Sequence, residues 1–485
     1  MTFGGGMNGI HKNYIAGEWV EGEDATRNVN PSDTTDIVGL YAQANAAQLD
    51  AAVVAARAAF PAWSRTTPQE RHDVLSRVSG EVAARRDELG RLLAREEGKT
   101  LPEAIGEVGR AAQIFDFFAG EAVRIQGEKF ASVRPGVDVE VTREPVGVVG
   151  IITPWNFPIA IPSWKIAPAL CYGDCVVFKP ADLAPGSAHA LAEVIVRAGV
   201  PKGVFNLVMG RGSLVGQAML DHRHVDAISF TGSAATGRRV AAACANAMRK
   251  FQLEMGGKNP LVVLDDADLK TAVECAANGA YFSTGQRCTA TSRLIVTPGI
   301  YARFAAALAE RMRALVVDDA LKPGVDIGPV VDQTQFDQDL SYVRIGRDEG
   351  AKLALGGEPL NRATPGFYMA PALFVDADNG MRIAREEIFG PIAAMIPARD
   401  YEHALALAND TEFGLCAGIC TTSLKHASHF KRAIEAGMAM VNLPTAGVDY
   451  HAPFGGRKGS SLGPREQGRY AAEFYTTVKT AYTMA

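Results

Sequence analysis

The chain has 485 residues, of which 47% are hydrophobic and 21% charged, and its formal net charge is −5. This length predicts two or three domains, and the mixture of acidic and basic residues excludes a charge field suited to nucleic acid or an anionic membrane. The sequence contains neither a secretory signal pattern nor an apolar stretch of the roughly 20 residues that span a bilayer. The seven cysteines lie mostly in apolar segments, which is typical of reduced thiols. We therefore expect a cytoplasmic globular protein.

Apolar residues recur at helical spacing over residues 45–130, and this period predicts several helices. Alternating and β-branched residues over 137–153 predict an extended hairpin. From 146 to 230, short apolar runs alternate with helical segments, as expected of a parallel sheet covered on both faces. A second set of this kind begins at Asn259. The fold class is therefore α/β, and the apolar tail "YAAEFYTTVKTAYTMA" predicts a final strand that needs a partner sheet.

Cys288 differs from the other cysteines because it lies in the polar, glycine-containing segment "STGQRCTA". The other cysteines have the apolar neighbours typical of small core residues. Cys288 is therefore a candidate nucleophile. A thiol is mostly protonated at neutral pH, so a catalytic cysteine needs a base or a lowered pKa.

Three segments offer partners for Cys288. Glu254 lies among apolar neighbours in "FQLEMGGKNP", where burial would raise the carboxyl pKa and make it a usable general base. Asn156, in "TPWNFP", follows a predicted strand, and an amide held there can donate to an oxyanion. Lys179 ends the next strand, in "VVFKP", at the edge where open α/β sheets bind ligands.

Two glycine-containing turns, "FTGSAATG" and "MGRGSLVG", would let the backbone approach a phosphate at a helix N-terminus. Neither spells GxGxxG, and each alone is a weak signal. The segment Gly459–Gly463 matches GxSxG, but no strand precedes it, so no nucleophile elbow is predicted. Two CxxxC pairs lie in apolar runs, which indicates packing rather than zinc, and no metal site is predicted.

Seven motifs resemble the aldehyde dehydrogenase superfamily in order and spacing: "TPWNFP", "KPAD", "FTGSAATG", "LEMGGKNP", "GQRCTA", "EEIFGP" and "PFGGRKGS". The resemblance covers nearly the whole chain. It implies a Rossmann-like dinucleotide-binding domain (1–126 and 146–257), an α/β catalytic domain (258–460) and a small β oligomerisation flap (127–145 and 461–485). It also implies a homodimer or homotetramer.

The resemblance assigns four catalytic residues. Cys288 corresponds to the nucleophile that attacks the aldehyde carbon, and Asn156 with the Cys288 backbone N–H corresponds to the oxyanion hole. Glu254 corresponds to the base that activates water against the thioester. Lys165 corresponds to a lysine that helps to relay the proton.

The implied coenzyme is NAD or NADP, with NAD favoured. Asp182 stands where many NAD-using relatives carry glutamate, and a carboxylate there repels a 2′-phosphate. Glu387 corresponds to the glutamate that hydrogen-bonds the nicotinamide ribose. The full set of expected coenzyme-binding residues is Ile152, Thr153, Pro154, Trp155, Lys179, Ala181, Asp182, Gly212, Gly216, Phe230, Thr231, Gly232, Ser233, Thr236, Gly256, Glu387 and Phe389.

The C-terminal segment looks most like the branch that oxidises 2-oxoglutarate semialdehyde (2,5-dioxopentanoate). Trp164 and Phe282 replace the arginines of succinate semialdehyde dehydrogenases, so Arg287 is the expected cation for the substrate carboxylate. Phe454 is expected to line the substrate site as well. One alternative is a broad aliphatic or aromatic aldehyde dehydrogenase. Another is a Cys-Glu-Lys hydrolase, which would need no dinucleotide site.

Overall fold

A computed structural model describes residues 9–484. Residues 1–8 and 485, the ends of the predicted ranges 1–126 and 461–485, lie outside the described residues. The larger of two main sheets has eight strands, in the spatial order β22 (Ser461–Leu462), β12 (Lys250–Glu254), β11 (Ala227–Thr231), β8 (Val148–Ile152), β9 (Cys175–Lys179), β10 (Phe205–Leu207), β2 (Asn13–Ile15) and β3 (Glu18–Val20).

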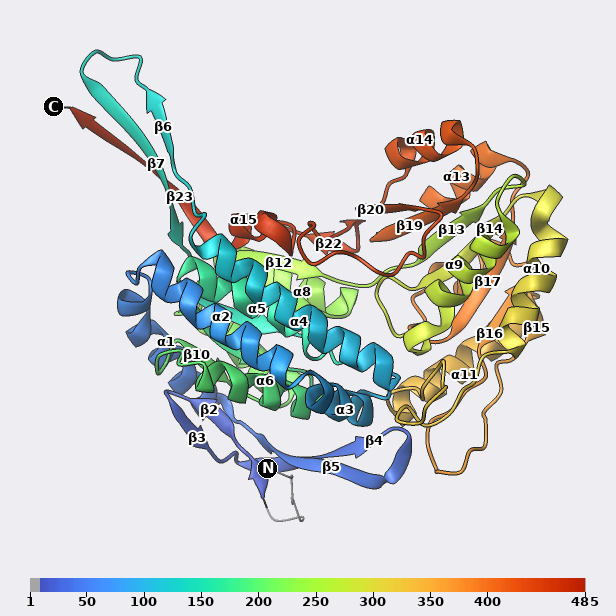
Figure 1. Cartoon of the computed structure of the whole chain (residues 1–485), viewed down its shortest axis with the longest axis horizontal. Helices are drawn as coiled ribbons and strands as arrows, with labels where there is room; N and C mark the ends of the chain where they lie inside the picture. Colours follow the sequence, from blue (N-terminus) through green and yellow to red (C-terminus); the bar gives the residue numbers. More distant parts are fainter. Residues whose placement is uncertain (1–8, 485) are drawn as a thin grey trace.

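Helices cover this sheet, and α2, α4 and α6 lie across its near side in Figure 1. Two of these helices begin at capping boxes. Thr67 and Glu70 form one at α2, and Thr100 and Glu103 form the other at α4. The helices of this part are α1 (Ala46–Trp63), α2 (Pro68–Ala84), α3 (Arg86–Glu97), α4 (Leu101–Ala122), α5 (Ala160–Tyr172), α6 (Pro185–Arg197), the π-helix η1 (Gly212–Gly216), α7 (Gln217–Asp221) and α8 (Ala234–Asn246).

The strands β12, β11, β8, β9 and β10 run parallel, so their carboxyl ends meet at one edge. Ile152 lies between Lys179 and Phe230 in the strand register. Thr231 lies opposite Glu254. The ends of four neighbouring strands therefore carry predicted site residues to the same place.

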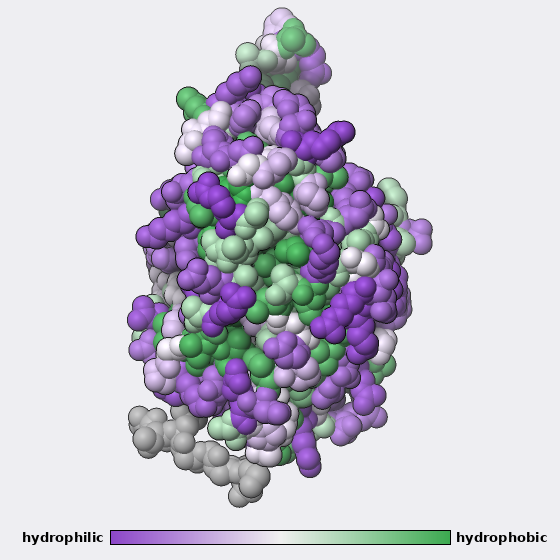
Figure 2. Space-filling view, turned by 90° about the vertical axis from the view of Figure 1, so that its right-hand side faces the viewer, coloured by the Kyte–Doolittle hydropathy of each residue, from purple (hydrophilic) through white to green (hydrophobic). Residues whose placement is uncertain are grey.

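The second sheet has seven strands, in the order β15 (Lys352–Leu355), β16 (Ala372–Val375), β17 (Ile392–Pro397), β14 (Thr291–Val296), β13 (Asn259–Val263), β19 (Cys416–Cys420) and β20 (Met438–Val441). Its helices are α9 (Leu269–Tyr281), α10 (Pro298–Arg313), α11 (Gln333–Asp348), α12 (Arg382–Arg385), α13 (Tyr401–Asn409) and α14 (Leu424–Ala433). Figure 2 shows the outer face on this side, where small groups of hydrophobic residues are separated by hydrophilic ones.

A three-stranded sheet projects from the body of the molecule (Figure 1). It contains β6 (Glu128–Ala131), β7 (Val137–Pro145) and β23 (Thr476–Met484), and β23 pairs with β7 along its whole length. The predicted small β-sheet is confirmed, and its C-terminal strand begins at Thr476. Ser461–Leu462 pairs with β12 in the eight-stranded sheet, and α15 (Ala472–Tyr475) separates that pairing from β23.

The N-terminal residues form strands that the periodicity does not single out. A separate sheet contains β1 (Ile10–His11), β5 (Asp33–Gln43) and β4 (Asp24–Asn30), and a two-stranded sheet joins β18 (Phe413–Gly414) to β21 (Arg457–Lys458). No helix in residues 9–484 is long and apolar enough to cross a membrane. The α/β fold with two main sheets and a small β-sheet agrees with the predicted fold class.

Candidate active site

Cys288 follows a strained turn at the end of α9. Ser283 and Thr284 have φ values of 51° and 57°, in the left-handed region, and such residues cost roughly 1–3 kcal/mol each. Glu103 of α4 accepts the N–H and the hydroxyl of Ser283, both at 2.9 Å. The hydroxyl of Thr284 donates to the carbonyl of Gly328 at 3.1 Å. These contacts fix the backbone that leads to the nucleophile.

Cys288 is half-buried, whereas the other six cysteines are buried. Burial raises the pKa of the Cys288 thiol above its ordinary value, and the carboxyl groups of Glu387 and Glu254 raise it further. The thiol is therefore neutral at neutral pH in this arrangement. A thiolate there requires a nearby positive charge or transfer of its proton to a base.

Asn156 is brought to the backbone just before Cys288. Its side chain is buried, and Nδ2 donates to the carbonyl of Gln286 at 2.9 Å. Its own carbonyl accepts a hydrogen bond of 2.7 Å from Nζ of Lys99. The amide therefore lies within the loop that presents the thiol, as an oxyanion donor requires.

The sequence analysis missed the pair that holds Asn156. Lys99 and Glu107 form a buried ion pair with an N–O distance of 2.7 Å, and both side chains are 1% exposed. The other carboxylate oxygen of Glu107 accepts the N–H groups of Ile159 and Ala160 at the start of α5, both at 3.0 Å. A lysine and a glutamate on a helical segment usually indicate a solvated face, so no local signal predicted this burial.

Glu254 ends β12 and is buried, as its apolar neighbours predicted. Burial raises its pKa well above the ordinary value, and the nearby carboxyl group of Glu466 adds to this effect. Gln252 Nε2 donates to Glu254 Oε1 at 3.2 Å, and the Ser461 hydroxyl donates to Oε2. Ser461 belongs to the rejected GxSxG match, and its hydroxyl orients a carboxylate here.

Lys165 lies beneath Glu254 in a polar network. Its Nζ forms an ion pair with Glu466 and donates to the Ser229 hydroxyl at 2.8 Å. Gln252 Oε1 lies 3.4 Å from Lys165 Nζ, so Gln252 joins Lys165 to Glu254. Glu466 was not predicted, because it lies 301 positions from Lys165 in a segment with no recognisable period.

The predicted coenzyme residues gather at the strand ends described above. The hydroxyls of Thr153 and Thr231 are buried there without a protein partner. A Cβ on Gly256 would lie 2.1 Å from the Glu387 carboxylate, so a larger residue would displace that side chain. These unpartnered donors and the glycine cradle fit a dinucleotide.

The remaining coenzyme candidates surround the same edge. Ser233 caps α8 directly after Gly232. Lys179 pairs with Asp182 at 3.0 Å, and Gly212 of η1 is close to the Lys179 ammonium group. The others are Pro154 and Trp155 after β8, Ala181 after β9, Gly216 in η1, Thr236 in α8, and Phe389, whose ring centroid is 5.5 Å from that of Trp155.

Glu387, which precedes β17 of the second sheet, contacts the coenzyme residues of the first sheet at Gly257. It accepts the N–H of Gly257 at 2.8 Å. Burial raises its pKa to about 7, so the carboxyl group is partly protonated at neutral pH.

The predicted substrate residues form two groups. Trp164 and Phe454 are buried with ring centroids 5.3 Å apart, next to Lys165. Phe282 is half-buried in the turn before Cys288. The guanidinium of Arg287 donates to the carbonyls of Asn278 and Gly279 in α9, so the protein already uses one of its nitrogens.

Comparison with known proteins agrees with this geometry. The profile of the aldehyde dehydrogenase family matches residues 19–481. Alpha-ketoglutaric semialdehyde dehydrogenase from Bacillus subtilis is 44% identical over 474 residues, covering 97% of this chain and 97% of that protein. Alpha-ketoglutarate semialdehyde dehydrogenase from Haloferax volcanii is 43% identical, covering 98% of this chain and 99% of that protein.

A solved structure supports the same conclusion. Betaine aldehyde dehydrogenase from Staphylococcus aureus, crystallised in complex with NAD+, superimposes with a TM-score of 0.95. The two sequences are 34% identical, and the match covers 98% of this chain and 95% of that one. The chain therefore belongs to the aldehyde dehydrogenase family and is an NAD(P)-dependent aldehyde dehydrogenase.

Proposed function

We propose that this enzyme oxidises 2-oxoglutarate semialdehyde to 2-oxoglutarate. The observation that carries the proposal is the identity of 44% and 43%, over nearly the full chain, to two enzymes named for that substrate. A carboxylate-bearing aldehyde also needs a cation near the nucleophile. Arg287, directly before Cys288, is the cation that the sequence alone suggested for this contact.

Cys288 acts as the nucleophile and forms a covalent bond to the aldehyde carbon. Asn156 Nδ2 and the backbone N–H of Cys288 donate to the oxygen as it becomes negative. Donors fixed before the reaction stabilise such a charge without reorganisation. The fixed position of Asn156, which Lys99 holds at 2.7 Å, supports this role.

Glu254 acts as the base that removes a proton from water when the Cys288 thioester is hydrolysed. Its raised pKa makes it a stronger proton acceptor than an exposed carboxylate. Gln252 and Lys165 connect it to Glu466, and this network offers a path for the proton.

Residues at the carboxyl ends of β8, β9 and β11 would hold the coenzyme, with Gly232 and Ser233 near its pyrophosphate. Lys179 and Asp182 would hold the adenosine ribose, and Glu387 the nicotinamide ribose. When bound, an oxidised nicotinamide coenzyme supplies a positively charged ring and a hydride acceptor. We favour NAD because the Asp182 carboxylate, expected beside the adenosine ribose, would repel a 2′-phosphate.

Two other functions remain alternatives. Trp164, Phe282 and Phe454 give the site aromatic walls, which favours a broad aliphatic or aromatic aldehyde dehydrogenase. A Cys-Glu-Lys hydrolase would leave the unpartnered hydroxyls of Thr153 and Thr231 without a purpose.

Initial rates across aldehydes with and without a terminal carboxylate, each with NAD and with NADP, test this proposal. The expected result is the highest kcat/KM with 2-oxoglutarate semialdehyde and NAD. Equal kcat/KM for hexanal would favour the broad-specificity alternative. Turnover of an amide without coenzyme would favour the hydrolase.

The division into a coenzyme domain (1–126 and 146–257) and a catalytic domain (258–460) accompanies this proposal, as does a cytoplasmic location. We further propose a homodimer or homotetramer formed through the small sheet. Val478, Tyr482 and Met484 of the edge strand β23 are exposed in the single chain, and an uncovered apolar edge promotes association. Removal of residues 476–484 should yield monomeric or insoluble protein in size-exclusion chromatography.

A further inference from the structure

Arg110 on α4 is a partly buried cation whose protein contacts leave most of its hydrogen-bonding capacity unused. One nitrogen, Nη2, donates to the carbonyl of Val448. Its Nε is buried without a protein partner. Asp449 and Glu107 act on it only through space, and Glu107 is already paired with Lys99. A guanidinium carries five N–H donors, so one carbonyl acceptor leaves it unsaturated.

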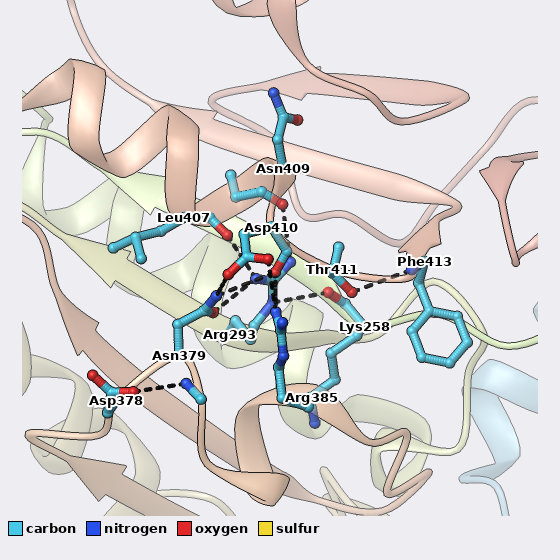
Figure 3. Close-up of polar contacts among 12 residues, drawn as sticks. Lys258, Arg293, Asp378, Asn379, Arg385, Leu407, Asn409, Asp410, Thr411 and Phe413 are labelled. Carbon is cyan, nitrogen blue, oxygen red and sulfur yellow. Dashed lines mark hydrogen bonds and ion pairs between the residues drawn. The ribbon is translucent and has the colours of Figure 1, made fainter.

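Arg293 shows how this fold satisfies an arginine that serves only structure. It is fully buried, and Figure 3 shows acceptors gathered around its guanidinium. Its nitrogens donate to the carbonyls of Lys258, Leu407 and Ala408 and to the side chain of Asn379, at 2.8–3.1 Å. Buried cations normally have such partners. Arg110 has one such acceptor and an unpartnered Nε, so donors remain for a ligand if its position allows one to reach them.

The position of Arg110 on α4 places it near the oxyanion donor. Glu107 precedes it by three residues, a rise of about 4.5 Å along a helix. Glu107 binds the first N–H groups of α5, which begins shortly after Asn156. Arg110 therefore lies about one helical turn from the residues that hold Asn156.

The segment bonded by Arg110 borders the nucleophile and the aromatic wall. It connects β20 of the second sheet to β22 of the first, and Figure 1 shows it crossing between them. Within it, the Thr445 hydroxyl donates at 2.7 Å to the carbonyl of Thr289, the residue after Cys288. Val448 is three residues further on, at most about 10 Å of chain. Phe454, later in the segment, packs on Trp164.

We propose that Arg110 determines substrate specificity by binding the carboxylate of the aldehyde substrate while its carbonyl carbon reacts at Cys288. The inference rests on the proposed function, since it assumes a carboxylate-bearing aldehyde. Each guanidinium uses only Nη2, which donates to two backbone carbonyls in Arg287 and to one in Arg110, and the Nε of each has no protein partner. Arg110 therefore keeps one more N–H free for a contact with a carboxylate.

The test compares kcat/KM for 2-oxoglutarate semialdehyde and for pentanal in wild type, Arg110→Leu, Arg110→Lys and Arg287→Leu. Arg110→Leu should lose about 10- to 150-fold for the semialdehyde, chiefly through KM, and change less than about threefold for pentanal. Arg110→Lys should retain part of the preference, because the charge remains but the fork does not. Arg249→Leu is the matched control, since Arg249 is also half-buried and also donates to one carbonyl, that of Leu220. It should leave both values unchanged.

Three results would overturn the assignment while the proposed function stands. An Arg110→Leu enzyme that keeps the wild-type preference would exclude Arg110, and a selective loss only in Arg287→Leu would transfer the role to Arg287. Equal losses for both substrates in Arg110→Leu would mean that Arg110 only supports the segment around Val448. A wild-type enzyme without any preference for the semialdehyde would instead refute the proposed function, and the inference with it.

Discussion

The coenzyme side of the site is built from neighbouring strand ends, whereas the substrate side is assembled from helices, a turn and a connecting segment that lie far apart in sequence. The register of β11, β8 and β9 alone aligns Phe230, Ile152 and Lys179. By contrast, Arg110 of α4 meets Val448 across 338 positions of sequence. Parallel strand pairing places side chains at regular positions. A contact between distant irregular segments has no such rule.

The two sides also differ in how their charges are compensated. On the coenzyme side, Lys179 has a partner in Asp182, which is 40% exposed. On the substrate side, Lys99–Glu107 and Lys165–Glu466 are buried ion pairs with side chains 0–3% exposed. Removing one member of a buried pair leaves an uncompensated charge and is strongly destabilising. Substitutions on the substrate side should therefore combine losses of chemistry with losses of stability.

The largest effect should come from Cys288→Ala, at the junction of the two sides. We expect oxidation to fall by at least about 10⁴-fold, because no other half-exposed thiol is available in the described residues. Coenzyme binding, measured by quenching of reduced-nicotinamide fluorescence, should remain. Cys244→Ala, which removes a buried thiol on α8, is the control and should stay active. Loss of coenzyme binding in Cys288→Ala would mean that the two sides cannot be separated at this residue.

Glu254→Gln should separate the two chemical steps. We expect a hydride burst of about one per active site, followed by turnover reduced about 10²- to 10⁴-fold, because water then lacks its base. Rapid mixing with absorbance detection of the reduced coenzyme measures both phases. Steady turnover near the wild-type rate would exclude Glu254 as the deacylation base.

Lys99→Met tests how much the buried Lys99–Glu107 ion pair contributes to the free energy of unfolding. It leaves the buried Glu107 carboxyl group without its cation, and we expect about 3–5 kcal/mol of lost unfolding free energy. A urea titration measures the change. Lys129→Met, which breaks a well-exposed ion pair with Asp138, is the control and should leave the midpoint unchanged.

The double substitution Lys99→Met with Glu107→Gln sharpens this test. It removes both charges, so part of the lost stability should return even though Asn156 has lost its lysine donor. A kcat that stays low after stability returns would identify Lys99 as the residue that positions Asn156. A full return of kcat would mean that Lys99 serves stability alone.

The fold class could be predicted because the spacing of hydrophobic residues is a local property of the sequence. It changes from a helical to an alternating period where helices give way to strands. Cys288, Glu254 and Asn156 could be located because each lies in a short motif at the end of a strand or helix. The register then brings Glu254 opposite Thr231 without further information. These features depend on neighbours in sequence.

Lys99, Glu107, Arg110 and Glu466 could not be found in this way. Most of their partners lie far along the chain, as with the 301 positions that separate Lys165 from Glu466, although Lys99 and Glu107 are only eight positions apart. From sequence alone, a charged residue is also expected to be exposed to solvent. The pairing of Ser461–Leu462 with β12 in the larger sheet was also missed, because such a pairing is not visible in a two-residue strand.

The smallest expected effect is a change of about tenfold per pH unit, in coenzyme affinity for one side of the site and in kcat for the other. On the coenzyme side, burial raises the pKa of Glu387 to about 7. Its carboxylate accepts hydrogen bonds better than its acid form, so coenzyme affinity should weaken as pH falls below 7. On the substrate side, burial raises the pKa values of the Cys288 thiol and the Glu254 carboxyl group. Both act in their deprotonated forms, so kcat should rise as pH increases through the alkaline range.

Two measurements from pH 6 to 10 check this difference: the dissociation constant of the coenzyme and the kcat for the semialdehyde. The substrate carboxylate is ionised throughout this range, so it contributes no titration of its own. Glu387→Gln should remove the pH dependence of coenzyme binding near 7 but leave the alkaline rise in kcat. If one substitution flattened both profiles, the two sides would titrate as a single coupled group, and the comparison between them would fail.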